Sequence, residues 1–261
     1  MNSVIVHYQE IALKGRNRPW FVERLVNNLR DVTRDLDIQQ VRPLMGRIEL
    51  TLGSECEWSM VRERVSRVFG IANYAQAGRT TRDVDEIAAM VLGDLDRDER
   101  VSKDRVGRFR VRASRADKSY YLTSPELERE VGGRIKESKG WTVDLSNPDL
   151  EIRLEVLPEC VFYALNKEPG QGGLPTGTSG AAMCLLSGGI DSPVAGFRLM
   201  KRGCRVHFVH FHAYPILSRT SQDKTKELAE LLTHYQLRSN LYTVPFGQLQ
   251  QRVVISVPPP L

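Results

Sequence analysis

The 261-residue sequence predicts a mixed protein with an α+β unit, a second α/β unit and part of a doubly wound parallel α/β domain. Strands and helices alternate as β-α-β-α through residues 1–75, and a second mixed set follows over 76–165. A stretch rich in glycine and proline, 166–180, comes next. Beyond it, over 181–261, strand and helix alternate strictly, as in a doubly wound sheet.

The first unit rests on two strands and two helices. VIVHY at 4–8 is short and β-rich, and the apolar residues of 18–36 recur every three or four positions, which predicts a helix. RIELTL at 47–52 alternates polar and apolar residues, as a half-buried strand does. The helical period returns at 57–69. This order is that of a small α+β sandwich.

The second unit is predicted from the same periodicities. A helix with an acidic first turn is expected over 81–95, and GRFRVRAS at 107–114 alternates as a strand. A further helix is expected over 124–138, with Ser124 as its N-cap. Two strands over 150–157 and 160–165 read as a pair joined by a short turn.

After the glycine- and proline-rich linker, AMCLL is a continuous apolar run of the kind buried on both faces of a parallel sheet. Helices and strands then alternate in short succession. The expected elements are a strand at 182–186, a helix with Pro193 as its first residue, a strand at 206–211, a helix at 218–235 and a strand at 241–246.

The positive charge of the chain is concentrated locally. The formal net charge is +5, but residues 100–118 alone hold eight basic side chains and two acidic ones. Within the strand at 107–114, the side chains of Arg108, Arg110 and Arg112 point to one face. Together with Arg115 and Lys118 this row is predicted to bind a ladder of phosphates, as in a nucleic-acid backbone. The alternative is an arginine-rich face that is only solvated.

The cysteines and the hydropathy exclude other classes of protein. Cys56, Cys160, Cys184 and Cys204 are widely spaced, so neither a disulfide framework nor a zinc knuckle is predicted. No segment approaches the roughly 18 to 20 consecutive apolar residues of a membrane span, and the N-terminus lacks a basic leader. We therefore expect a cytoplasmic protein without a membrane partner.

The loop Ser187-Gly188-Gly189-Ile190-Asp191-Ser192 follows the first buried strand, where anions usually bind in a parallel sheet. Glycines allow backbone amides to approach an anion, and the following helix points its positive end at it. The loop lacks the lysine of a Walker A motif, which favours pyrophosphate as its ligand. Asp191 is predicted either to hold Mg²⁺ or to cap the helix. An ordinary glycine-containing turn is the alternative for the loop as a whole.

Several motifs resemble one known family. SGGxDS in this setting is similar to the PP-loop of ATP pyrophosphatases. EIALKGRN, SRADKSYYLTSPELEREVGGRI, VDLSNPDLEIRLEV and the linker GQGGLPTGTSG together resemble the tRNA uridine 4-sulfurtransferases, or thiouridine synthetases. The resemblance implies an N-terminal ferredoxin-like domain over 1–75, a THUMP RNA-binding domain over 76–165, a linker over 166–180 and a partial PP-loop domain over 181–261.

This resemblance also implies an activity. ATP would adenylate uridine 8 of tRNA, and a persulfide sulfur would replace the activated oxygen, with sulfur also passing to the thiazole of thiamine. The implied cofactors are ATP and Mg²⁺, and the implied partners are tRNA, a cysteine desulfurase and a sulfur-carrier protein of the thiamine pathway. The nucleotide contacts would be Leu185, Leu186, Ser187, Gly188, Gly189, Asp191, Ser192, His210 and Phe211.

The C-terminus departs from the family pattern. Only three strands are expected in the last domain, and the chain ends in three prolines and a leucine. We therefore expect a truncated chain, whose catalytic sulfur-carrying cysteine would lie beyond Leu261. The alternative function is a tRNA-binding module with an incomplete, non-catalytic nucleotide pocket. A different PP-loop tRNA enzyme, such as a 2-thiolation or lysidine-forming one, is a third reading.

Overall fold

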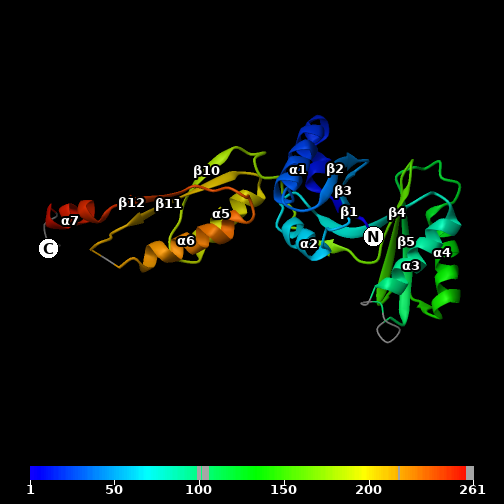
Figure 1. Cartoon of the computed structure of the whole chain (residues 1–261). Coiled ribbons are helices and arrows are strands. Elements are labelled where there is room, and N and C mark those ends of the chain that lie inside the picture. Colours follow the sequence, from blue (N-terminus) through cyan, green and yellow to red (C-terminus); the bar gives the residue numbers. More distant parts are fainter. Residues whose placement is uncertain (99–100, 102–105, 217, 257–261) are drawn as a thin grey trace. The chain divides into compact units, whose positions relative to one another are not determined.

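The computed structural model describes residues 1–98, 101, 106–216 and 218–256 (Figure 1). Two compact units account for the chain. The first comprises residues 1–8, 33–62 and 72–169, and the second comprises 9–32, 63–71 and 170–261. Among the described residues no helix is both long enough and apolar enough to cross a membrane. Part of the basic stretch 100–118 and the terminal prolines lie outside the described residues.

A nine-stranded sheet forms the first unit, as far as the described residues go, in the order β2-β3-β1-β4-β8-β7-β5-β6 with β9 beside β4. β5 runs parallel to β6 and β7, and the other pairs are antiparallel. The strands are β1 (Ser3–His7), β2 (Ile38–Leu44), β3 (Arg47–Leu52), β4 (Asn73–Thr80), β5 (Arg108–Arg115), β6 (Thr142–Val143), β7 (Leu150–Val156), β8 (Val161–Ala164) and β9 (Glu168–Pro169).

β4 is shared between two parts of this sheet. Its residues 73–77 pair with β1, whereas 78–80 pair with β8. The predicted boundary between 75 and 76 therefore falls inside a single strand. Gly78 lies at the changeover, where the ring of Tyr163 occupies the place of a side chain: a Cβ there would come within 2.0 Å of the ring. Only glycine fits this position without moving the ring.

Two helices, α3 (Val84–Arg97) and α4 (Ser124–Lys139), cover one face of the β4-β8-β7-β5 part (Figure 1). Apolar residues from alternate strand positions and from both helices form the core between them. The N-cap of α4 is Thr123 rather than Ser124, and Thr123 forms a capping box with Glu126. Glu126 can reach back to the Thr123 amide because it stands three residues on.

The second compact unit of the structure, which includes residues from 170 onward, contains a three-stranded parallel sheet in the order β10-β11-β12 among its described residues. Two helices, α5 and α6, pack on one face of this sheet, and their apolar residues form a core with Phe69 (Figure 1). The strands are β10 (Ala181–Leu185), β11 (Arg205–His212) and β12 (Leu241–Pro245). The helical segments are the 3-10 helix η1 (Glu10–Asn17), α1 (Arg18–Val32), α5 (Asp191–Lys201), α6 (Thr220–Thr233) and α7 (Gly247–Ser256).

The predicted fold class is confirmed, since every strand and helix expected from the periodicities is present within a few residues. A short helix, α2 (Trp58–Ser66), replaces the longer one expected at 57–69. The sequence did not reveal the strands β2, β4, β6 and β9 or the helices η1 and α7. IQQVRPL and NYAQAGRT are too polar to resemble strands, although they become strands through pairing with apolar neighbours.

Candidate functional site

Hydrogen bonds between Ser187 and Ser192 fix the conformation of the loop between β10 and α5. Ser192 Oγ accepts a hydrogen bond from the Ser187 amide at 2.9 Å and lies 3.1 Å from Ser187 Oγ. Ser187 Oγ in turn accepts from the Gly189 amide at 3.3 Å. The strand β10 therefore ends in a closed ring of hydrogen bonds at the start of the helix. This ring fixes the backbone of the loop before any ligand binds.

Two other backbone amides of the loop take no part in this ring. The amides of Gly188 and Ile190 find no acceptor among the described residues. The helix α5 begins at Asp191, two residues before the expected Pro193, and Ile190 is its N-cap without a capping side chain. Open amides at a helix start attract an anion. Their geometry suits a phosphate or pyrophosphate group.

His210 ties the loop to the neighbouring helix. Its Nδ1 lies 2.9 Å from the Leu186 carbonyl oxygen, and its Nε2 lies 3.2 Å from Ser221 Oγ. A carbonyl oxygen only accepts, so this network assigns the proton to Nδ1, and Nε2 accepts from the Ser221 hydroxyl. The buried imidazole is therefore saturated by protein groups. His210 positions the loop, and its side chain has no nitrogen left for a nucleotide.

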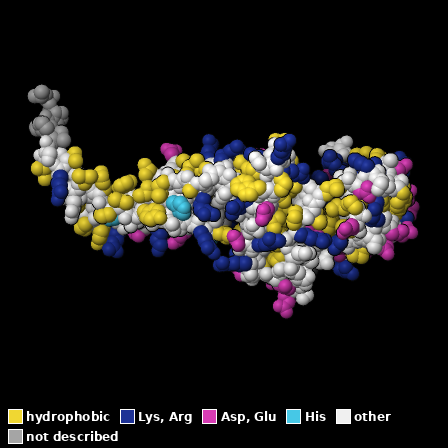
Figure 2. Space-filling model, turned by 90° about the horizontal axis from the view of Figure 1, so that it is seen from above, with side chains coloured by type: hydrophobic (Ala, Val, Ile, Leu, Met, Phe, Trp, Pro, Cys, Tyr) yellow, Lys and Arg dark blue, Asp and Glu magenta, His cyan; other side chains and the backbone are white. Residues whose placement is uncertain are grey.

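The remaining predicted nucleotide contacts divide between two faces of the sheet. In the parallel register Leu185 pairs with Val209, so Leu185 and Phe211 lie on the same face, opposite the helices. They are 67% and 49% exposed, and Phe211 packs edge-on against Phe246 at 5.6 Å. Leu186 is buried on the helix face. Figure 2 shows apolar side chains gathered over this C-terminal part of the chain.

The predicted arginine row exists, but two of its members are already paired. Arg108 Nη2 donates to Asp149 Oδ1 at 2.9 Å, and this hydrogen bond lowers the pKa of Asp149. Arg110 donates from both Nε and Nη2 to Oε2 of Glu151 on β7. These carboxylates stand opposite the arginines because β5 and β7 run side by side. The two guanidinium groups are therefore largely neutralised within the sheet.

The other predicted RNA contacts differ from each other. Arg115 donates to the carbonyl oxygens of Tyr120 and Leu122, at 3.3 and 2.8 Å, and so holds the loop after β5. Lys118 is exposed. Arg112 is exposed as well, and it has no carboxylate partner among the described residues. Arg112 and Lys118 are thus the cations of the set that are open to a ligand.

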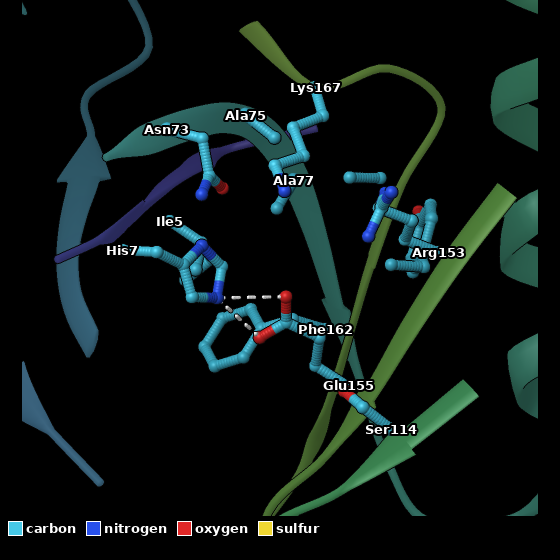
Figure 3. A pocket seen from close by; sticks show the side chains of 12 residues that line it. Ile5, His7, Asn73, Ala75, Ala77, Ser114, Arg153, Glu155, Phe162 and Lys167 are labelled. Atoms are coloured by element: carbon cyan, nitrogen blue, oxygen red, sulfur yellow. Dashed lines mark hydrogen bonds and ion pairs between the residues drawn. The ribbon is translucent and has the colours of Figure 1, made fainter. Parts of the chain in front are cut away.

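The polar face of the nine-stranded sheet is the face that carries Arg112 on β5 and Arg153 and Glu155 on β7. A pocket of about 230 Å³ opens on this face, beside β1, β4, β7 and β8 (Figure 3). His7 Nε2 lies 3.0 Å from Glu155 Oε1, and Arg47 contacts the other oxygen. Burial raises the pKa of Glu155, but the hydrogen bond and charge of His7, with Arg47 and Arg153, outweigh burial and lower the pKa. Glu155 is therefore held as a carboxylate at the floor of the pocket.

Two cations line the rim of this pocket, and one of them, Arg153, is in close contact with Glu151. Arg153 and Lys167 line it with Asn73, as Figure 3 shows. Burial lowers the pKa of Lys167, and the charge of Arg153 lowers it further. Burial and the charge of Arg112 likewise lower the pKa of Arg153. Cations that depress one another in this way gain from a bound anion.

Sequence reasoning missed this pocket. His7 and Glu155 are 148 positions apart, and only the sheet order β1-β4-β8-β7 brings them together. The one available signal was the alternation of Glu151, Arg153 and Glu155 along a strand with an apolar opposite face. That alternation predicts a polar sheet face, but it does not predict which residues of other strands lie beside it.

Comparison with known proteins finds three family models in succession. The ThiI ferredoxin-like domain matches residues 3–75, the THUMP domain 81–164 and the thiamine biosynthesis protein ThiI 177–261. The chain belongs to the ThiI family. The probable tRNA sulfurtransferases of Thermus thermophilus and Alkaliphilus metalliredigens are 38% and 39% identical over 96% and 97% of the chain. The chain spans 60% and 64% of these two relatives.

Solved structures agree with this membership of the ThiI family. A crystal structure of a 4-thiouridine synthetase–RNA complex with bound ATP aligns with a TM-score of 0.83 at 32% identity, covering 99% of this chain and 65% of that one. PH1313 from Pyrococcus horikoshii aligns with a TM-score of 0.80 at 29% identity, covering 98% of this chain and 84% of that one. This member of the ThiI family therefore shares the folds found in the aligned parts of both chains.

Proposed function

We propose that this ThiI-family chain is the RNA-binding and ATP-binding part of a tRNA sulfurtransferase that makes 4-thiouridine at position 8 of tRNA. The observation that carries the proposal is the loop after β10, whose amides at Gly188 and Ile190 are open beside a helix start. It is supported by the likeness to a synthetase that binds RNA and ATP. The division into domains at about 75, 165 and 180 belongs to the same proposal.

The loop fits the phosphates of ATP. Gly188, Gly189 and Ser187 would surround the pyrophosphate, and Leu185 and Phe211 offer apolar surface to the adenine. Asp191 is exposed in the first turn of α5, so its carboxylate is free to hold Mg²⁺, which takes its other ligands from phosphate and water. Bound ATP would supply an adenylyl group that turns the uridine oxygen into a leaving group.

The RNA-binding surface in this proposal is the polar face of the nine-stranded sheet. Arg112 and Lys167 form the part of it that has no carboxylate partner among the described residues, Lys118 extends it, and Arg153 is paired with Glu151. Contacts from these cations would go to phosphates, which fix the position of RNA without reading its sequence. Arg108, Arg110 and Arg115 contribute less, because each is committed to a protein acceptor.

The remaining partners follow from the resemblance to the thiouridine synthetases. A cysteine desulfurase would provide persulfide sulfur, and a sulfur-carrier protein of the thiamine pathway would be a second acceptor. A cytoplasmic location is part of this proposal, since tRNA and these partners would be met there.

The experiment is ATP–pyrophosphate exchange with and without tRNA, together with direct binding of each ligand. Exchange that depends on tRNA supports the enzyme. Binding of tRNA without binding of ATP and without exchange contradicts the enzyme for this chain and favours the alternative, a tRNA-binding module with a non-catalytic pocket. Absence of tRNA binding would contradict both functions.

A further inference from the structure

The glycine loop lacks a lysine of its own, but a lysine from another element lies beside it. Lys224 belongs to the second turn of α6. A Cβ placed on Gly188 would lie 3.8 Å from both Cβ and Cδ of Lys224. The aliphatic stem of this lysine therefore lies beside Gly188, at a separation that a methyl group on Gly188 would just fill.

The position of Lys224 is fixed by its neighbours in the helix. Ser221 and Thr225 stand one turn before it and directly after it, and the hydroxyl groups of both lie against the ring of His210. Thr225 is fully buried and donates to the Ser221 carbonyl oxygen at 2.7 Å. His210 in turn holds the Leu186 carbonyl, just before the loop. One hydrogen-bonded chain thus sets this turn of α6 against the loop.

The ammonium group of Lys224 is open to a ligand. Lys224 is exposed, and it has no carboxylate partner among the described residues. Lys226, on the same helix, differs in pointing to Glu230, with 3.9 Å between Nζ and Oε1. A lysine on a helix turn that is fixed beside the loop, with its charge unpaired, is placed to bind an anion there.

We propose that Lys224 binds the β- and γ-phosphates of ATP, and hence the pyrophosphate that leaves, from the side of α6. It takes the place of the lysine that a Walker A loop carries in its own sequence. This inference rests on the proposed ATP-dependent function and adds a residue that discriminates triphosphate from monophosphate. Gly188 then has a second role: any side chain there would lie against the lysine stem.

The test measures binding of ATP, inorganic pyrophosphate and AMP by calorimetry in the presence of Mg²⁺. Lys224→Ala should weaken ATP and pyrophosphate binding about tenfold, with AMP changed by less than about twofold, because only the outer phosphates lose a charge-assisted contact. Lys224→Arg should restore part of the affinity. Lys226→Ala is the matched control, and its affinities should equal those of the unchanged chain.

Each outcome decides between the two proposals. If ATP binds the unchanged chain and Lys224→Ala binds it equally well, the role of Lys224 is wrong and the ATP-dependent function stands. If pyrophosphate binding falls in Lys224→Ala while ATP gives no exchange with tRNA, the lysine is confirmed and the function fails. Equal losses in Lys224→Ala and Lys226→Ala, or no binding of ATP or pyrophosphate to the unchanged chain, overturn the inference. Lys224→Gln, which keeps the stem, replaces the alanine variant if that variant unfolds.

Discussion

The polar face of the nine-stranded sheet and the loop of the three-stranded sheet hold their polar groups in opposite ways. On the sheet face, Arg108 and Arg110 are neutralised by carboxylates of neighbouring segments. In the loop, the amides of Gly188 and Ile190 have no acceptor among the described residues. Residue type therefore identifies a candidate binding group, whereas the hydrogen bonds and ion pairs that the group makes within the protein determine whether it is available to a ligand.

The largest effect is expected where the sheet face is most tightly paired. Glu155→Ala removes the carboxylate shared by His7 and Arg47 and leaves the buried guanidinium of Arg47 without its carboxylate. The free energy of unfolding should fall by about 3 kcal/mol, measured by urea denaturation. Glu159→Ala, at an exposed position, is the control and should change it by less than about 0.5 kcal/mol. Equal effects would mean that the pairing around Glu155 contributes nothing.

The open cations of the same face should matter for RNA rather than for stability. The double variant Arg112→Ala and Lys167→Ala should weaken tRNA binding about thirtyfold and reduce its salt dependence by about two released ions. Filter binding over a range of salt concentrations measures both. Arg108→Ala, which removes a paired cation, should change affinity by about twofold at most. A larger loss for Arg108→Ala would reverse the distinction between paired and open arginines.

In the loop after β10, the hydroxyl group of Ser192 fixes the backbone conformation. Ser192→Ala removes the group that accepts from the Ser187 amide. ATP affinity should fall about tenfold, because the loop would lose its fixed shape before binding. Calorimetric titration with ATP measures this, and Ser256→Ala, at an exposed position in α7, is the matched control. An unchanged affinity would show that the ligand itself arranges the loop.

The smallest effect concerns pH. The pKa of Glu155 is lowered in the folded chain, so its contribution to stability is present above its ordinary value near pH 4.5. This contribution is lost as the pH falls through the folded pKa. The stability difference between the unchanged chain and Glu155→Gln, followed by denaturation from pH 7 to pH 3, should therefore shrink below about pH 4.5. A constant difference would contradict the lowered pKa.

Local periodicity predicted much of this molecule and none of its long-range pairing. The alternation of GRFRVRAS correctly placed three arginines on one face, and the apolar run before Ser187 correctly predicted a strand, loop and helix. Which arginine is open depends on β7, some forty residues later in the chain. The sequence does not place Lys224 at the loop for the same reason: it is 36 positions from Gly188 and lies beside the loop only through the packing of α6.

The shared strand β4 has a consequence for any attempt to divide the protein. Because residues 73–77 pair with β1 and 78–80 with β8, a cut at the predicted boundary would leave half a strand on each fragment. Both fragments would present bare strand edges, which recruit other chains into intermolecular sheets. The ferredoxin-like and THUMP parts should therefore be expressed and purified as one piece. The two fragments produced separately should aggregate.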